Sequence, residues 1–322
     1  DHRDLHSFPT RRSSDLSVPQ AVTEAGLQVR YVDVGHDLNL SLDGLRQALS
    51  AETLAVIAPH MYACPAPIEE IEALCREAGV FLVDDAAQVV GVRVGGRLLG
   101  TFGDVGVISF AQSKTVVTGI RGSGGVLLVN RPVWVDELGQ LCGNLPSSSS
   151  RLGPLADFLW NHVGRPYTGH TGYYLGRLFG LEPAAPPTAA QISHLEASIA
   201  LVQLGRLDAL LAEKTQIAQL YHQALQAYPR IQFPQFSPGR YLARVMLRLP
   251  QGASVSAVRS RALRLGVETR SGYAVHVPSD VIAPQAEAFA QRLVGVPCRN
   301  GMTESDAHAI CAALDASLAD NG

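Results

Sequence analysis

The residue best suited to covalent chemistry is Lys114, in the stretch SFAQSKTVVTG that begins at Ser109. Lys114 and Lys214 are the only lysines of the chain, although lysine and arginine together number 26. Arginine serves wherever charge alone is needed, whereas a desolvated lysine amine can lose its proton and attack a carbonyl. Lysine here indicates imine chemistry, with a solvated surface charge as the alternative interpretation.

Three further polar residues are expected to lie near Lys114. Asp85 ends an apolar run, Gln88 follows it by three residues, and Ser109 lies in the next apolar run. Pyridoxal phosphate (PLP) needs a lysine for its aldehyde, a carboxylate that keeps its pyridine nitrogen protonated, and donors for its phosphate. The four residues together indicate a PLP site. A loop cap remains the alternative for Asp85.

The expected elements place these residues at one edge of a sheet. Strands that alternate with helices of about a dozen residues indicate a mainly parallel α/β sheet with right-handed crossovers. Sites in such sheets lie at the carboxyl ends of the strands, which is where Asp85 and His60 fall. We expect strands at 27–34, 54–60, 80–85, 104–111 and 122–130, helices at 40–50 and 67–79, and a hairpin at 90–100.

The C-terminal half predicts a second, smaller α/β domain. We therefore expect a large cofactor-binding domain in residues 17–204, followed by a linking helix and a small domain in residues 205–322. The patterns behind this division are a long helix at 192–228, a strand at 240–249, and helices at 253–266 and 304–319.

The composition excludes several functional classes. With 47% hydrophobic and 17% charged residues the chain is globular, and a formal net charge of -3 argues against a nucleic-acid partner. No apolar run is long enough to span a membrane. The five cysteines are odd in number and lack metal-site spacing, which predicts reduced thiols in the cytoplasm and no metal site.

The first 16 residues have a different character from the rest. HSFPTRRSSDL, at residues 6–16, is what one reading frame of a common short-read sequencing adapter encodes. We interpret residues 1–16 as non-native, with a genuine basic arm as the alternative. On this interpretation the cofactor domain lacks its N-terminal part.

Two stretches resemble a known family. VDDAAQVVG at 83–91 and GDVGVISFAQSK at 103–114 are similar to the D-x-A-Q and G-D-x-x-x-x-S-F-x-x-x-K motifs of the DegT/DnrJ/StrS-type aminotransferases. Those enzymes act on nucleotide-linked keto sugars and have the type I PLP fold. The resemblance runs from about Ser17 to the C-terminus. It implies a mainly parallel central sheet flanked by helices, with a smaller C-terminal α/β domain.

The resemblance implies a role for each candidate residue. Lys114 would form the imine and carry a proton, and Asp85 would bind the pyridine nitrogen. Gln88 would lie near the phenolic oxygen of the cofactor, and Ser109 would bind its phosphate. His60, in a stretch that resembles the family's His-x-Tyr-Gly, would either abut the cofactor or be a hydrogen-bonded structural histidine.

The implied activity is transfer of an amino group from glutamate to a keto sugar or a related carbonyl compound, by a homodimer. The family's dehydratase members have histidine at the position of Lys114, so lysine favours transamination. A PLP-dependent sugar dehydratase and a non-catalytic or regulatory member remain alternatives.

The sequence departs from the family pattern at phosphate-binding positions. The N-terminal Gly-Thr turn would precede Ser17, and the Asn-Tyr-Arg stretch aligns with Ala189, Ala190 and Gln191. In the loop after the lysine, Arg121 either supplies a compensating contact or is an ordinary loop arginine.

Overall fold

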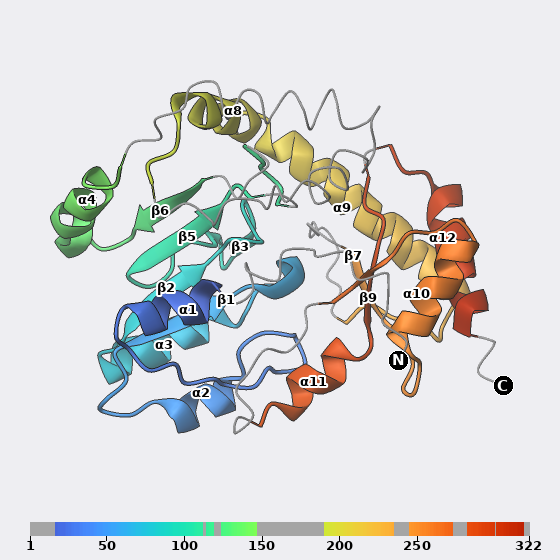
Figure 1. The fold of residues 1–322 in the computed structure, drawn as a ribbon, viewed down its shortest axis with the longest axis horizontal. Helices are drawn as coiled ribbons and strands as arrows, with labels where there is room; N and C mark the ends of the chain where they lie inside the picture. The colour runs from blue at the N-terminus through green and yellow to red at the C-terminus, as the bar shows by residue number, and fades with distance from the viewer. Residues whose placement is uncertain are drawn as a thin grey trace, which may run out of the picture.

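A four-stranded sheet forms the centre of the N-terminal part (Figure 1). The structure is a computed structural model that describes residues 17–111, 114–118, 124–146, 190–234, 245–272, 282–299 and 301–318. The strand order is β1-β2-β5-β6, with the first three strands parallel and β6 antiparallel to β5. The mainly parallel α/β sheet is confirmed. The strands are β1 (Ala55–Pro59), β2 (Phe81–Asp85), β5 (Val105–Ser109) and β6 (Gly125–Val129).

The crossover from β1 to β2 shows why the sequence folds this way. Helix α3 (Ile68–Ala78) buries Ile68, Ile71 and Cys75, whose spacing gives one apolar face. The helix ends at Gly79, whose φ of 68° lies in the left-handed region that glycine adopts without strain. The chain then enters β2 directly, so the helix and both strands form one compact crossover unit.

A short hairpin follows Asp85, as the sequence predicts. It consists of β3 (Arg93–Val94) and β4 (Arg97–Leu98). Gly95 and Gly96 have φ angles of 53° and 82°, which a two-residue hairpin turn of this hand requires. The paired glycines therefore account for the turn.

An ion pair joins this hairpin to α3. Arg97 donates both guanidinium nitrogens to the Glu72 carboxylate, at 2.8 and 3.2 Å, and the Gly103 N–H donates to the same group at 2.8 Å. Burial acts toward a higher pKa of Glu72. The hydrogen bonds from Arg97 and Gly103, with the charges of Arg97 and Arg76, outweigh burial and hold the pKa below its ordinary value.

This lowered pKa predicts an acid-dependent loss of stability. Because the folded pKa of Glu72 lies below the ordinary value, its contribution is present above that value and disappears as the pH falls through the folded pKa. The Glu72→Gln variant should therefore be less stable than the wild type at pH 7, and the difference should shrink toward pH 3 in urea unfolding. The exposed Glu70 on the same helix gives the control, Glu70→Gln. A gap that is constant with pH would contradict this account of Glu72.

The C-terminal part contains a three-stranded antiparallel sheet of order β7-β9-β8. Helix α10 packs on this sheet, and α12 packs on α10. The long helix α9 packs against α12 and joins the two parts (Figure 1). The core is continuous, because Leu82, Tyr221, Leu247 and Leu314 belong to one buried cluster. The elements are β7 (Val245–Arg248), β8 (Arg270–Ser271), β9 (Leu293–Val296), α9 (Leu207–Ala224), α10 (Val255–Arg264), α11 (Pro284–Ala290) and α12 (Glu304–Leu318).

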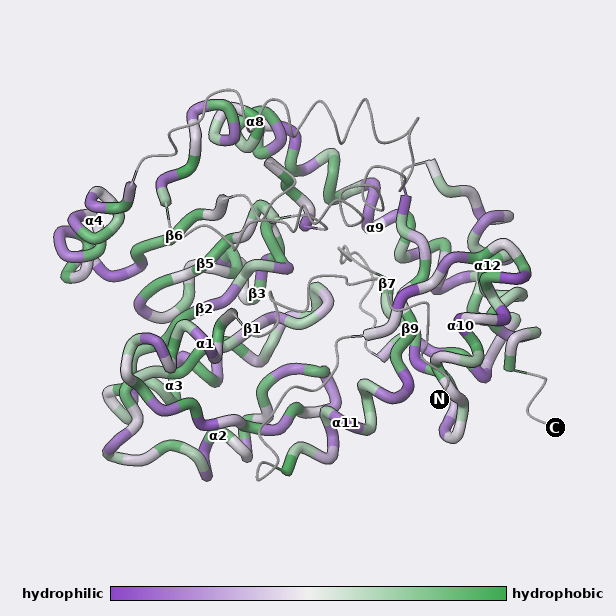
Figure 2. Tube along the Cα trace, in the orientation of Figure 1, coloured by the Kyte–Doolittle hydropathy of each residue, from purple (hydrophilic) through white to green (hydrophobic). Residues whose placement is uncertain are grey.

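The predicted division into domains, 17–204 and 205–322, stays a prediction. Figure 2 shows hydrophobic residues along the strands of both sheets, as a shared interior requires. Residues 1–16, interpreted above as non-native, lie outside the described residues. The remaining helices of the N-terminal part are α1 (Ser17–Glu24), α2 (Leu42–Ala48) and α4 (Val135–Gly143).

The expected strand at 27–34 is wrong. Only Val34 takes part in any bridge, an isolated one with Leu40. The segment is held by side-chain contacts instead, since the Arg30 guanidinium donates to the Ala48 carbonyl at 2.7 Å. The Asp33 carboxylate in turn accepts the backbone N–H groups of residues 285 and 286 at the first turn of α11, both at 3.0 Å. The alternation of apolar and polar residues reflects this packing and not a ladder of strand pairs.

The expected single helix at 192–228 is two helices. Helix α8 (His194–Leu204) begins with a capping box in which Ser193 and Glu196 bond each other's backbone N–H groups. It ends at Gly205, and Arg206 has a φ of -115° and a ψ of 15°, outside the helical region. Because glycine is a poor helix former, the break falls there.

Candidate active site

The carboxyl ends of three parallel strands bring the candidate residues to one edge. Asp85 pairs in register with Pro59 of β1 and with Val107 of β5. His60 follows β1 directly, and Ser109 is the last residue of β5. Since neighbouring strands lie about 4.8 Å apart, these residues share one edge of the sheet.

Asp85 is the acidic group of this edge. Its Oδ1 accepts the Ala87 N–H at 3.1 Å, and its carbonyl accepts the His60 N–H at 3.3 Å. Burial raises the pKa of Asp85, while the Ala87 N–H and the positive charge of Lys114 oppose that rise. The charge of Lys114 therefore acts on the Asp85 carboxylate, and a shared site for the two groups stays a prediction. Lys114 itself is half-buried.

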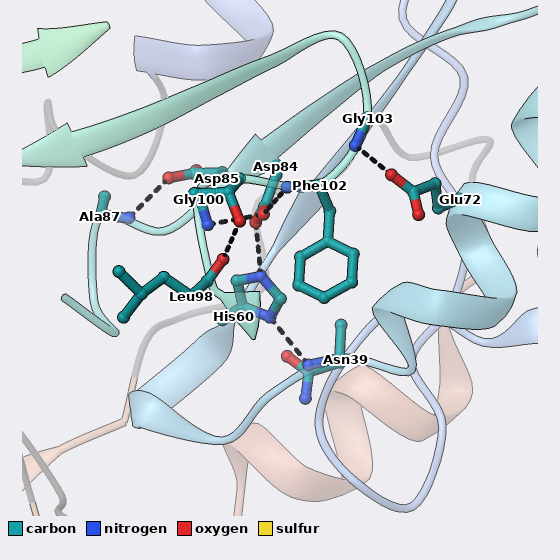
Figure 3. A network of polar contacts seen from close by, with 12 residues as sticks. Asn39, His60, Glu72, Asp84, Asp85, Ala87, Leu98, Gly100, Phe102 and Gly103 are labelled. Carbon is teal, nitrogen blue, oxygen red and sulfur yellow. Dashed lines mark hydrogen bonds and ion pairs between the residues drawn. The ribbon is translucent and has the colours of Figure 1, made fainter. Parts of the chain in front are cut away.

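The neighbouring Asp84 has a different environment (Figure 3). It is completely buried, and its Oδ1 lies 2.7 Å from Nε2 of His60. Its Oδ2 accepts the backbone N–H groups of Gly100, at 2.6 Å, and Phe102, at 3.1 Å. Successive strand residues face opposite sides of the sheet, so the side chains of Asp84 and Asp85 point to different faces. Asp84 bonds His60 after β1 and the backbone after the hairpin, all in the interior. Asp85 belongs with the candidate residues at the carboxyl edge.

His60 uses both ring nitrogens within the protein. Its Nδ1 accepts the Ala66 N–H at 2.9 Å, so the ring hydrogen is on Nε2 and is donated to Asp84. Because the side chain is fully buried, these bonds describe the structural histidine of the alternative interpretation. A contact of His60 with the cofactor stays a prediction.

The turn after His60 has an unusual backbone held by two amide side chains. Tyr62 and Ala63 have φ angles of 54° and 63°, a region that costs a non-glycine residue about 1 kcal/mol or more. Asn39 accepts the N–H of Met61 at 2.8 Å and donates to the Cys64 carbonyl at 3.1 Å. The Asn39 side chain therefore bonds the turn on both sides of its left-handed pair.

Gln88 contributes the second amide. Its Oε1 accepts the Tyr62 N–H at 3.0 Å, which fixes the orientation of the amide. One N–H of its Nε2 donates to the Met61 sulfur at 4.0 Å. The second N–H can donate to an oxygen of a ligand, while the acceptor is engaged with the turn.

Removing the Asn39 amide is expected to destabilise the protein. Asn39 is 1% exposed, and Asn39→Ala removes its hydrogen bonds with the Met61 N–H and the Cys64 carbonyl. Such a loss costs about 1–3 kcal/mol of the free energy of unfolding, measured by urea titration. The exposed Asn144 gives the control, since Asn144→Ala should change it by less than about 0.5 kcal/mol. Equal effects of the two variants would show that the turn does not depend on Asn39.

The loop that carries Lys114 begins at Ser109. The Ser109 hydroxyl accepts the Ala111 N–H at 3.3 Å, and the Lys114 N–H bonds the Ala111 carbonyl at 3.2 Å. Thr115 is 8% exposed, and its hydroxyl has no partner in the part of the chain that the structure describes. The loop therefore presents an amine with two hydroxyls close to it in sequence.

These residues fit PLP. The edge combines a lysine amine, the partly buried carboxylate of Asp85, an amide donor and the hydroxyl of Ser109. The unpaired hydroxyl of Thr115 indicates that one more polar partner can be accommodated. Ala189, where the phosphate contact of the family's Asn is expected to be lost, and Arg121 lie outside the described residues. Gln191 bonds the carbonyls of residues 142 and 143 at the end of α4.

Comparison with known proteins decides the family. A sequence model of the DegT/DnrJ/EryC1/StrS aminotransferase family matches residues 14–315. The chain belongs to this family. The match confirms the resemblance seen in the motifs at 83–91 and 103–114. Members of this family are PLP-dependent.

Individual relatives support the same fold. The chain is 29% identical to the GDP-perosamine synthase of Vibrio cholerae over 195 residues, which is 61% of this chain and 44% of that protein. The match thus spans less than half of the curated relative. The structure superposes on the aminotransferase TlmJ of Streptoalloteichus hindustanus with a TM-score of 0.74 and 27% identity, over 94% of this chain and 76% of that one. For PseC of Helicobacter pylori, an aminotransferase involved in the biosynthesis of pseudoaminic acid, the TM-score is 0.74 at 13% identity, over 95% and 78%.

Membrane-spanning helices and metal-binding clusters are both absent from the described residues. Within the described ranges no helix has the length and hydrophobicity that crossing a membrane requires. The same ranges contain no cluster of His, Cys, Asp and Glu that could hold a metal ion.

Sequence reasoning missed two side chains that shape the site. Asn39 bonds the turn after His60 from 21 positions upstream in the sequence, and Asp84 bonds His60 itself. The paired aspartates at the end of β2 were a usable signal for Asp84, because adjacent strand residues face opposite sides. No local pattern points to Asn39.

Proposed function

We propose that the protein is a PLP-dependent aminotransferase that moves an amino group from glutamate to a nucleotide-linked keto sugar or a related carbonyl compound. Membership of the aminotransferase family supports the reaction class. The observation that carries the proposal is the carboxyl edge of the sheet, where Asp85 lies in register with Pro59 of β1 and with Val107 of β5, the strand that ends at Ser109 just before Lys114. When bound, PLP supplies an aldehyde that takes up amines and a ring that draws electrons from the attached carbon.

Asp85 stabilises positive charge on the ring nitrogen. Burial raises the pKa of Asp85, which means that its ionised form lacks sufficient solvation. A protonated pyridine nitrogen beside the carboxylate would provide the missing favourable interaction. The carboxylate would in turn keep the proton on that nitrogen, because removing it would leave the partly buried charge uncompensated.

Lys114 would bind the aldehyde of the cofactor and would move a proton. Only its neutral amine can attack a carbonyl, and lysine, unlike arginine, can lose its proton in a protein. When it is not bonded to the cofactor, the same amine would remain on the loop, where it could take up and return the proton that moves during amino transfer. Gln88 can donate from Nε2 to the phenolic oxygen, and the Ser109 hydroxyl can donate to the phosphate.

The proposal includes a homodimer in the cytoplasm. Type I sites are commonly completed by a second subunit, which suits the departures from the family pattern at phosphate-binding positions. All five cysteines are free thiols, a state typical of a reducing compartment.

Trapping of the cofactor tests the site. The purified chain is mixed with PLP, reduced with borohydride and digested, and the modified peptide is identified by mass spectrometry. Because Lys114 and Lys214 are the only lysines, a label on a side chain can lie at only these two positions. The N-terminal amine is the one other group that can form an imine. We expect stoichiometric label on Lys114 and none on Lys214, which lies in α9. Label on Lys214 alone, or no label, would refute the site.

The amino donor tests the reaction. With PLP bound and no acceptor present, glutamate should yield about one equivalent of 2-oxoglutarate per site, since the amino group remains on the enzyme. A sugar dehydratase needs no glutamate, so absence of this half-reaction despite label on Lys114 would favour the dehydratase. A regulatory member would show neither turnover of glutamate nor conversion of a keto sugar.

A further inference from the structure

We propose that Gln203 of α8 is a positioning residue that fixes the loop carrying Lys114 in the place where it can react with the cofactor. The inference rests on the proposed function for the role of Lys114. The contacts of Gln203 with the loop stand independently of it. Gln203 is 89 positions beyond Lys114 in the sequence, and neither composition nor motif singles it out.

The Gln203 carboxamide bonds both polar groups of one backbone residue. Its Oε1 accepts the Val117 N–H at 3.1 Å, and its Nε2 donates to the Val117 carbonyl at 2.7 Å. The same Nε2 donates to the Ile199 carbonyl of its own helix at 3.2 Å. The side chain is therefore held by α8 while it holds Val117. Only a carboxamide of suitable length offers a donor and an acceptor in this arrangement.

The residues on either side of Val117 are also immobilised. Val116 is 0% exposed and packs in a small cluster with Val90, Phe110 and Ala200 of α8. The Thr118 N–H bonds the Phe110 carbonyl at 3.2 Å. Hydrophobic packing of Val116 thus holds the loop against α8, and the paired hydrogen bonds to Val117 fix its position along that helix.

This arrangement fixes the stretch of backbone from which the Lys114 side chain extends. Lys114 is three residues before Val117, and its charge already acts on Asp85. A loop that shifts relative to α8 changes the approach of the amine to Asp85 and to the cofactor aldehyde. A misplacement of about 1 Å can cost on the order of a hundredfold in rate, so a remote positioning residue is expected to have a measurable effect.

The test replaces the Gln203 carboxamide without changing side-chain length. Gln203→Met removes both bonds to Val117, and Gln203→Glu keeps the acceptor for the Val117 N–H but loses the donor. The matched control is Gln226→Met, because Gln226 also donates from its amide to a carbonyl four residues earlier but lies far along the chain from the loop. Urea unfolding of all variants separates global stability from the local effect.

The first readout needs no cofactor. Trace acetylation of the native protein at several pH values gives the reactivity of Lys114 relative to Lys214, which serves as the internal reference in every sample. We expect Gln203→Met to change this ratio at least about threefold and to accelerate amide exchange at Val117. Gln226→Met should leave both unchanged, and Gln203→Glu should fall between. Wild-type values for both in Gln203→Met would overturn the inference.

The second readout concerns the reaction with PLP. The rate at which borohydride-trapped label accumulates on Lys114 should fall about tenfold in Gln203→Met at unchanged final stoichiometry. An unchanged rate would also overturn the positioning role. If the wild type takes up no PLP, the proposed function fails instead, and the acetylation ratio alone decides whether Gln203 positions Lys114.

Discussion

Replacing Lys114 with alanine is expected to abolish borohydride-trapped PLP label at the site and to lower amino transfer from glutamate by at least about a thousandfold. The reason is that no other lysine lies at the carboxyl edge, since Lys214 belongs to α9. The measurements are borohydride trapping and the yield of 2-oxoglutarate from a stoichiometric amount of enzyme. Lys214→Ala is the control and should behave as the wild type.

Lys114→Arg separates the charge of the residue from its chemistry. Arginine keeps the positive charge beside Asp85 but stays protonated and forms no imine. We expect Lys114→Arg to be as inactive as Lys114→Ala while it retains more of the electrostatic relief of Asp85. Activity in either variant above a few per cent of the wild type would show that Lys114 is not the reacting amine.

The parallel sheet and its edge were predictable because they depend on local patterns. Alternating helical and strand periods predict crossovers, and crossovers put the carboxyl ends of β1, β2 and β5 on one edge. Asp85 and Lys114 were chosen as candidates from position and residue type, since a carboxylate ends β2 and a rare lysine follows β5, and their roles stay predictions. These inferences needed no knowledge of distant contacts.

The supporting contacts were not predictable, because they join distant residues. Asn39 bonds the turn after β1, and Gln203 bonds the loop after β5, each through a carboxamide that has many other possible uses. The same limitation explains the wrong strand at 27–34, where Asp33 is committed to the first turn of α11 instead of a sheet. Strands β8 and β9 are two and four residues long, too short for a periodic signal.

Asp85 and Asp84 are adjacent, yet the same substitution is expected to change stability in opposite directions. Burial raises the pKa of Asp85, so its ionised form destabilises the PLP-free fold. A raised folded pKa in an acid means that stability falls as the pH rises from the ordinary value of 3.8 through the folded pKa. Asp85→Asn removes that charge and keeps an Oδ1 acceptor for the Ala87 N–H.

The Asp85→Asn protein without PLP should therefore have a higher Tm than the wild type at pH 7, with the difference vanishing below about pH 3.8. Asp84→Asn should lower Tm. The two carboxylate oxygens of Asp84 accept from Gly100 and Phe102 on one side and from His60 on the other. An amide has only one oxygen, so its NH2 group would face a donor on one of these sides. Thermal unfolding of the three proteins across this pH range gives both comparisons.

The stabilised Asp85→Asn variant should be a poor enzyme. A neutral amide does not hold a proton on the pyridine nitrogen, so we expect amino transfer to fall about a hundredfold or more while Lys114 still takes up PLP. Added PLP should also raise Tm more in the wild type than in Asp85→Asn, since only the carboxylate gains a cationic partner. If PLP stabilised both proteins equally, Asp85 would not contact the ring nitrogen, and its raised pKa would reflect burial at the sheet edge alone.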